Sequence, residues 1–310
     1  MKIPLGNTVS FLDTPVITDT TAVQTPYAFL GIPFGPPYRP ADLVACADAA
    51  DAVRRVTHDA AYALNWSHYD FDTGKPLFGS GVPTVTDCGD VETDVRNPDA
   101  VWAAGVAKLR PLTEAGRVPL VVGGLDSVPP IVVEAFDGLG TFNVLHVDAH
   151  LDFREEVDGI RRGYSSPIRR IREYGCVDQV VQVGLRSMGS ARPSDVEDAR
   201  AAGNRLVTTW ELHESGANAV LESLPIDNKW IITVDCDGLD PTIAPGVGWP
   251  EPGGLSYIEI ATLIRGLARK DLVAALIFTE FQPRLDYRGT TAKTIARLFL
   301  NVMGLQWNGS

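Results

Sequence analysis

The feature that most restricts the fold of this chain is a series of short apolar runs rich in β-branched residues, several of which contain no polar residue. A strand that is apolar on both faces needs cover on both faces, which is typical of a parallel sheet between two layers of helices. We therefore expect strands at residues 27–32, 120–122, 144–148, 180–185, 206–208, 230–235 and 273–278.

Longer segments with helical periodicity alternate with these strands, at residues 98–115, 129–136, 194–202, 257–269 and 291–302. This alternation predicts a doubly wound α/β sandwich, in which ligands bind at the carboxyl ends of the strands. The 310 residues contain no internal repeat, low-complexity tract or linker. We expect a single domain over residues 1–310, with an irregular N-terminal excursion around residues 36–86.

The charge of the chain limits its partners. A net charge of −12 and a pI near 4.8 argue against nucleic acid or an anionic membrane surface, and favour a small cationic partner. The chain shows no signal-peptide pattern and no apolar run of about 18 residues, and its cysteines lack CxxC spacing. We therefore expect a cytoplasmic protein with reduced cysteines.

The segment "NVLHVDAHLDF" places Asp148, His150 and Asp152 two residues apart at the end of an expected strand. This spacing directs the three side chains to one side of the chain. Two carboxylates and an imidazole in one place favour a bound cation. The alternative is a solvated turn that contains a histidine by chance.

A second acidic segment, "WIITVDCDGLDPTIAPG", carries Asp235 and Asp237 on one face at another strand end. Carboxylates at the end of a buried strand are costly unless they are paired or bind a metal ion. Both segments in one α/β chain predict a carboxylate-rich metal site. Asp240, at the start of the Asp-Pro loop, is expected to hold that loop by local hydrogen bonds.

A third segment, "IFTEFQPRLD", carries Glu280 just after a strand that should end at the same edge of the sheet. A carboxylate there suits a planar guanidinium group held by two hydrogen bonds. The alternative is a structural salt bridge to Arg284 or Arg288.

The segments "VDAHLD", "VDCDGLDPTIAPGVGWPEPGGL" and "TEFQPRLD" resemble successive signatures of the ureohydrolase family, which includes arginase and agmatinase. "FLGIPF", "DCGDV" and "VGLRS" resemble the structural segments around them, so the resemblance covers the chain from about residue 26 onwards. It implies a three-layer α/β/α sandwich with a mainly parallel sheet, and a trimeric or hexameric assembly.

The resemblance also implies two divalent metal ions, usually manganese and sometimes nickel. Asp148 and Asp235 would bridge the two ions. Asp152 would complete the first site, and His150 and Asp237 would complete the second. Metal ions lower the pKa of bound water, so hydroxide is available near neutral pH.

The same resemblance implies how the reaction would proceed. Asp152 would orient the hydroxide, and Glu280 would hold the guanidinium group while urea and an amine are released.

The sequence "GGLDS" departs from the family pattern Gly-Gly-Asp-His-Ser, because Asp126 occupies the place of a metal-binding histidine. Oxygen ligands suit manganese, but a fifth carboxylate adds negative charge to the site. The site would then make its bound water less acidic, leave the first metal position weak or empty, or keep Asp126 protonated. Alternatively, Asp126 caps a helix together with Ser127, ahead of Pro129.

Two further departures concern the surroundings of the site. Tyr164 stands where the family commonly has a histidine that assists proton transfer, and a tyrosine is a poor proton shuttle near neutral pH. An alanine-rich, helical-looking segment after the first strand replaces a loop rich in glycine and arginine. His146 shares a strand face with Asp148; we expect a buried histidine bonded to backbone rather than a group that supports the metal site.

The motifs leave two functions open. The one we favour is an agmatinase-like, metal-dependent amidinohydrolase that acts on a small cationic guanidino or substituted guanidine compound. The other is a catalytically weak or silent homologue that serves as the structural subunit of a hetero-oligomer with an active paralogue, because Asp126 and Tyr164 both replace catalytic histidines. A deacetylase of related fold is disfavoured, because the chain has no His-His pair.

Overall fold

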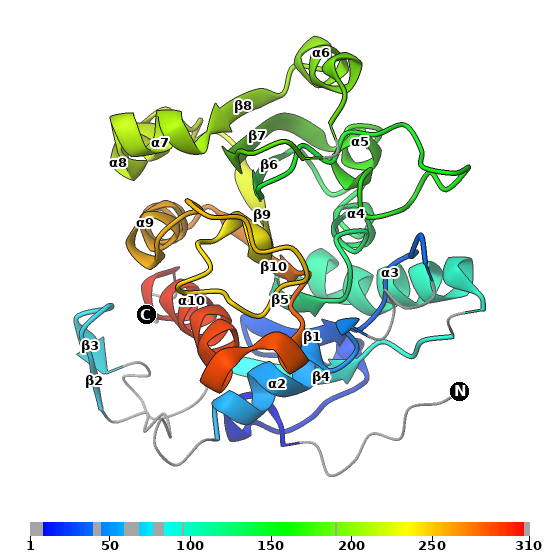
Figure 1. The fold of residues 1–310 in the computed structure, drawn as a ribbon. Helices are drawn as coiled ribbons and strands as arrows, with labels where there is room; N and C mark the ends of the chain where they lie inside the picture. Colours follow the sequence, from blue (N-terminus) through cyan, green and yellow to red (C-terminus); the bar gives the residue numbers. More distant parts are fainter. Residues whose placement is uncertain are drawn as a thin grey trace.

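The computed structural model describes residues 9–39, 45–58, 68–76, 84–94, 96–189 and 191–306. Its centre is an eight-stranded sheet in which every neighbouring pair of strands is parallel, with the strand order β4-β1-β5-β10-β9-β6-β7-β8 (Figure 1). The strands are β1 (Tyr27–Ile32), β4 (Val85–Asp90), β5 (Val118–Gly123), β6 (Phe142–Val147), β7 (Val177–Leu185), β8 (Arg205–Thr208), β9 (Lys229–Asp235) and β10 (Val273–Thr279).

Helices cover both faces of the sheet (Figure 1). One face carries α3 (Pro98–Glu114), α4 (Pro129–Glu134), α5 (Pro167–Ile171) and α6 (Pro193–Ala201). The other carries α2 (Ala49–Val56), α7 (Thr209–Ser215), α8 (Ala217–Glu222), α9 (Tyr257–Ala268) and α10 (Thr290–Gln306). Short 3₁₀ turns lie at Phe11–Asp13, Thr20–Ala22, Cys236–Gly238, Pro283–Leu285 and Tyr287–Gly289.

Each layer of helices encloses its own apolar core. Along β5, Leu120 and Val122 face one core while Val121 faces the other, as the period of two along a strand requires. Both faces of the strand are therefore buried, which explains its continuous apolar sequence. The predicted three-layer α/β/α sandwich with a parallel sheet is confirmed.

All seven expected strands and all five expected helices are present, with small changes at their ends. β4 and the short helices α5 and α8 were not predicted. The 36–86 excursion contains α2, the start of β4 and a small hairpin of β2 (Tyr69–Asp70) and β3 (Lys75–Pro76). Residues 40–44, 59–67 and 77–83 of that prediction lie outside the described residues.

The order of the strands determines where the functional segments meet. β5, β10, β9 and β6 are neighbours in space although they are far apart in the sequence, so the four segments that follow them share one edge of the sheet. Close approach there requires glycine at two positions. A Cβ on Gly238 would lie 2.6 Å from the backbone nitrogen of Asp148, and one on Gly124 would lie 2.4 Å from the Phe34 carbonyl oxygen.

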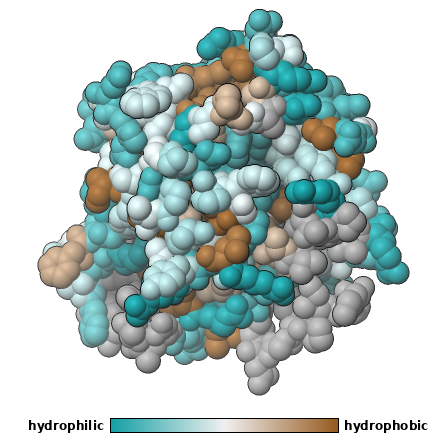
Figure 2. Space-filling model, in the orientation of Figure 1, coloured by the Kyte–Doolittle hydropathy of each residue, from teal (hydrophilic) through white to brown (hydrophobic). Residues whose placement is uncertain are grey.

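The surface is mixed in character. Hydrophobic residues appear as scattered patches among hydrophilic ones on the face shown in Figure 2. Within the described residues, no helix has both the length and the apolar character needed to cross a membrane.

Candidate active site

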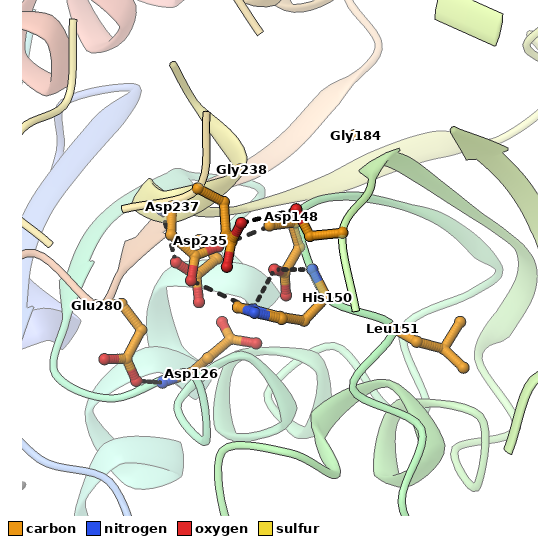
Figure 3. A network of polar contacts seen from close by, with 12 residues as sticks. Asp126, Asp148, His150, Leu151, Gly184, Asp235, Asp237, Gly238 and Glu280 are labelled. Atoms are coloured by element: carbon orange, nitrogen blue, oxygen red, sulfur yellow. Dashed lines mark hydrogen bonds and ion pairs between the residues drawn. The ribbon is translucent and has the colours of Figure 1, made fainter. Parts of the chain in front are cut away.

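The carboxyl ends of the four central strands bring the predicted site residues together (Figure 3). Asp148 follows β6, Asp235 ends β9 and Glu280 follows β10, while Asp126 lies in the turn after β5. A cavity of about 500 Å³ opens at this edge of the sheet. The predicted residues that line it are Asp126, His150, Asp152, Tyr164, Asp235, Asp237 and Glu280.

One group of side chains surrounds His150. Its Nδ1 atom lies 3.3 Å from Asp237 Oδ2 and 3.4 Å from Asp148 Oδ1. The backbone N–H of His150 donates to Asp148 Oδ1 at 2.6 Å, and the backbone N–H of Asp237 donates to Asp235 Oδ1 at 2.9 Å. Backbone donors therefore orient these carboxylates, and the three ligand atoms of Asp148, His150 and Asp237 are close enough to share one cation.

A second group consists of Asp126, His146 and Asp148, all of them buried. His146 Nε2 lies 3.0 Å from Asp148 Oδ2 and 3.7 Å from Asp126 Oδ2. These three atoms are buried without an aligned hydrogen bond. The expectation that His146 is bonded to backbone is wrong: its Nδ1 atom contacts the side-chain amide of Gln182, and its Nε2 atom faces the site. The error arose because the neighbouring strand supplies this partner.

Asp126 does not cap the helix that follows it. The residue at the N-cap of α4 is Val128, and no side chain caps that helix. Asp126 Oδ1 instead accepts a hydrogen bond of 2.5 Å from the Thr279 hydroxyl, and its other carboxylate oxygen faces His146. Thr279 was not predicted as a site residue, and its only signal in the sequence is its position beside Glu280 at a strand end.

Glu280 is fixed by the backbone of the β5 turn. Its Oε1 atom accepts a hydrogen bond of 2.9 Å from the N–H of Asp126, and its own N–H donates to the Gly124 carbonyl at 2.8 Å. Glu280 has a φ of 58° and Asp152 a φ of 46°, a left-handed conformation that costs a non-glycine residue about 1–3 kcal/mol. Backbone strain of this kind is concentrated at functional sites.

The carboxylates of the site repel one another. Burial and the negative charge of Asp148 raise the pKa of Asp237 to about 6. Burial and the charges of Asp126 and Asp237 raise the pKa of Glu280 to about 8, although the hydrogen bond from the Asp126 N–H favours the ionised form. Burial also raises the pKa of Asp126, Asp152 and Asp235. Burial disfavours charge on His150 and His146, yet the carboxylates raise their pKa values to about 12 and about 10.

These observations fit a bound cation. Some buried oxygens have no hydrogen-bond partner, the carboxylates repel one another, and the imidazoles have raised pKa values. All three features indicate a site that needs positive charge. Carboxylates together with one imidazole are ligands that suit Mn²⁺.

Tyr164 lies on the cavity wall and packs against Tyr38, with ring centroids 4.3 Å apart. The Tyr38 hydroxyl accepts a hydrogen bond of 3.1 Å from the backbone N–H of Ser165. The loop after β1 thus holds Tyr164 in place. Away from the cavity, Asp240 accepts hydrogen bonds from Thr242 and from the Gly253 N–H, as predicted for this loop.

The model of the arginase family matches residues 26–304. The chain belongs to the arginase family. It is 33% identical to N(1)-aminopropylagmatine ureohydrolase of Thermus thermophilus over 218 residues, 66% of this chain and 71% of that protein. It is 31% identical to the mitochondrial agmatinase of Gallus gallus over 242 residues, 76% of this chain and 70% of that protein.

Among solved structures, proclavaminate amidino hydrolase from Streptomyces clavuligerus has the same fold, with a TM-score of 0.82, 23% identity and 97% of each chain covered. The predicted membership of the ureohydrolase family, with agmatinase-like relatives, is thereby confirmed. Membership of the arginase family places the chain among homologues of hydrolases that act on guanidino compounds.

Proposed function

We propose that this arginase-family chain hydrolyses the C–N bond of a small guanidino or substituted guanidine compound, releasing urea and an amine in a metal-dependent reaction. The observation that carries the proposal is the convergence of buried carboxylates, some of whose oxygens have no hydrogen-bond partner, beside Glu280 at one cavity. Such a cluster attracts both metal ions and a cationic substrate.

The site residues would bind metal ions at two positions. Asp148 and Asp235 would bridge two divalent ions, of which Mn²⁺ is the first choice and Ni²⁺ the second. Asp126 and Asp152 would complete the first site, and the pair of His150 and Asp237, 3.3 Å apart, the second. Bound divalent ions supply a hydroxide nucleophile near neutral pH.

Other residues would bind the substrate. Glu280, ionised once positive charge is nearby, would hold the guanidinium group by paired hydrogen bonds. Its position is set by the Asp126 and Gly124 backbone rather than by a flexible partner. Tyr164 would donate a hydrogen bond at the cavity wall, in the place where the family commonly has a histidine. Because its ordinary pKa is near 10, we expect slow transfer of a proton to the leaving amine.

A second candidate function is that of a weakly active or silent subunit in a hetero-oligomer with an active paralogue. The hydrogen bond from Thr279 to Asp126 favours it, because it occupies one of the two oxygens that would bind metal. A homo-oligomeric trimer or hexamer is the corresponding proposal for an active chain.

The test is urea release by the purified chain, loaded with Mn²⁺ or Ni²⁺, from a panel that includes agmatine, arginine and 3-guanidinopropionate. Size-exclusion chromatography with light scattering gives the mass in the same buffer. Urea from any compound in the panel supports the proposed function. Absence of urea together with less than one metal ion per chain would refute it and favour the silent subunit.

A further inference from the structure

His146 lies within reach of the first metal site, but an imidazole binds a metal ion only through a nitrogen that carries no proton. The nitrogen that faces the site is Nε2, 3.0 Å from Asp148 Oδ2. Whether Nε2 is a ligand or a donor depends on the partner of the other ring nitrogen, Nδ1.

That partner is the Gln182 amide on the adjacent strand β7, in register with His146. The amide nitrogen of Gln182 lies 3.2 Å from His146 Nδ1. The same nitrogen donates a hydrogen bond of 2.7 Å to the Leu151 carbonyl. A carbonyl oxygen only accepts hydrogen bonds, so it determines which end of the amide faces His146.

The other end of the amide is also occupied, since Gln182 Oε1 accepts a hydrogen bond of 3.0 Å from the Asn204 side chain. Gln182 and His146 are fully buried, and both ends of the Gln182 amide have protein partners. Nδ1 of His146 therefore meets an N–H donor and must act as the acceptor. In the metal-loaded protein, where bound cations offset the charge of the carboxylates that favour a second proton, the ring is neutral and carries its hydrogen on Nε2.

We infer that Gln182 makes His146 a hydrogen donor to the carboxylates of the first metal site, and that this site binds its ion through oxygen atoms alone. The inference rests on the proposed metal-dependent function. The Nε2–H faces Asp148 at 3.0 Å and Asp126 at 3.7 Å without aligning on either oxygen. It lowers the repulsion between these two carboxylates and positions them.

A metal preference follows from this arrangement. The oxygen ligands of the first site come from Asp126, Asp148, Asp152 and Asp235, and carboxylate oxygens suit Mn²⁺ and Mg²⁺. The second site includes His150, and an imidazole ligand also suits Ni²⁺ and Zn²⁺. The two positions should thus differ in the ions that they accept.

The test is solid-state ¹⁵N NMR of histidine-labelled protein saturated with Zn²⁺, a diamagnetic ion that binds imidazole readily and so favours the opposite result. Signals are assigned by comparison with His146→Gln and His150→Asn. We expect one metal-bound ring, which disappears in His150→Asn, and a His146 ring with bare Nδ1 and protonated Nε2. A metal-bound ring that disappears in His146→Gln would overturn the inference.

Gln182→Leu removes the donor, and we expect it to abolish the fixed pattern of His146 while His150 stays bound to metal. An unchanged His146 pattern would refute the role of Gln182. If a variant does not fold, the number of metal-bound rings in the unmodified protein still decides the question. A spectrum with no metal-bound histidine would refute the proposed metal centre itself, an outcome distinct from failure of the inference.

Discussion

Two buried carboxylates in the sheet, one on the edge strand β4 and the other after β6, are stabilised in opposite ways. Asp87, on β4, accepts hydrogen bonds from Arg54 Nε and Nη2 at 2.8 and 3.0 Å, and from the backbone N–H groups of Phe11 and Gly89. Asp148, after β6, has one oxygen bonded to the His150 N–H and another without an aligned partner.

Asp87 is thus a structural carboxylate, whereas Asp148 belongs to the candidate active site. Arg54 supplies a cation from within the chain, so the charge of Asp87 is neutralised by the fold. Asp148 instead lies among further carboxylates, several of which have a raised pKa. Among the described residues Asp148 is paired with histidines, and the nearby Arg186 donates its hydrogen bonds to backbone carbonyls. A cation from outside the chain therefore explains this cluster better than folding stability does.

The largest expected effect is that of a substitution in the candidate active site. Asp235→Asn removes a proposed bridging ligand, and we expect metal content to fall to at most one ion per chain and kcat/KM for urea release to fall at least about 100-fold. Elemental analysis and a urea assay measure both. Asp240→Asn, which changes a loop carboxylate outside the cluster, is the matched control. Unchanged metal content in Asp235→Asn would contradict the assignment.

A substitution at the structural carboxylate Asp87 or its partner should instead lower stability and leave metal content unchanged. Arg54→Met leaves Asp87 buried without its cation, and we expect the free energy of unfolding to fall by about 3–5 kcal/mol. Metal content per folded chain should stay the same. Arg96→Met breaks an exposed pair with Asp94 and should change stability by less than about 1 kcal/mol. Equal losses in the two variants, measured by urea denaturation, would remove the distinction.

Metal removal should make the stability of the chain depend on pH, because the carboxylates of the site then repel one another. In the metal-free chain the pKa of Glu280 is raised from 4.5 to about 8, so the folded state binds more protons than the unfolded state between these values. The free energy of unfolding should therefore fall as pH rises from 5 to 8, by up to about 1.4 kcal/mol per pH unit for each such group. Asp237 acts in the same direction, and the lowered pKa of Asp148 has its effect below this range.

Denaturation in EDTA at several pH values tests this dependence, and the metal-loaded chain should show a smaller slope because bound ions keep the carboxylates ionised. Stability of the metal-free chain that increases with pH over this range would contradict the account.

The smallest expected effect concerns Thr279, whose hydroxyl donates a hydrogen bond to a carboxylate of the proposed metal site. Thr279→Val removes the hydrogen bond to Asp126, and we expect a stability loss of about 1.5–3 kcal/mol in the metal-free chain. The loss should be smaller with metal bound. Thr262→Val, on the exposed face of α9, is the control. No difference between the two variants would show that Asp126 does not depend on Thr279.

The sequence was informative where a residue's position follows from its own strand. The period of two and the strand ends predicted that Asp148, Asp235 and Glu280 would meet, because parallel strands place such residues at one edge. The continuous apolar runs similarly predicted the covered sheet.

Partners that depend on the order of strands were not predictable. His146 pairs with Gln182 because β7 lies beside β6, and Thr279 reaches Asp126 because β10 lies beside β5. β4 was missed because its run is interrupted by Asp87, whose charge is neutralised by Arg54, 33 positions away in the sequence. None of these adjacencies can be read from periodicity in one segment.

The metal content of the purified unmodified chain, after loading with Mn²⁺ and removal of excess metal, tests the proposed metal centre when urea release is measured on the same sample. We expect about two ions per chain, with the ion of the first site bound more weakly, and urea from a guanidino compound. Fewer than one ion per chain, with no urea from any compound in the panel, would contradict it.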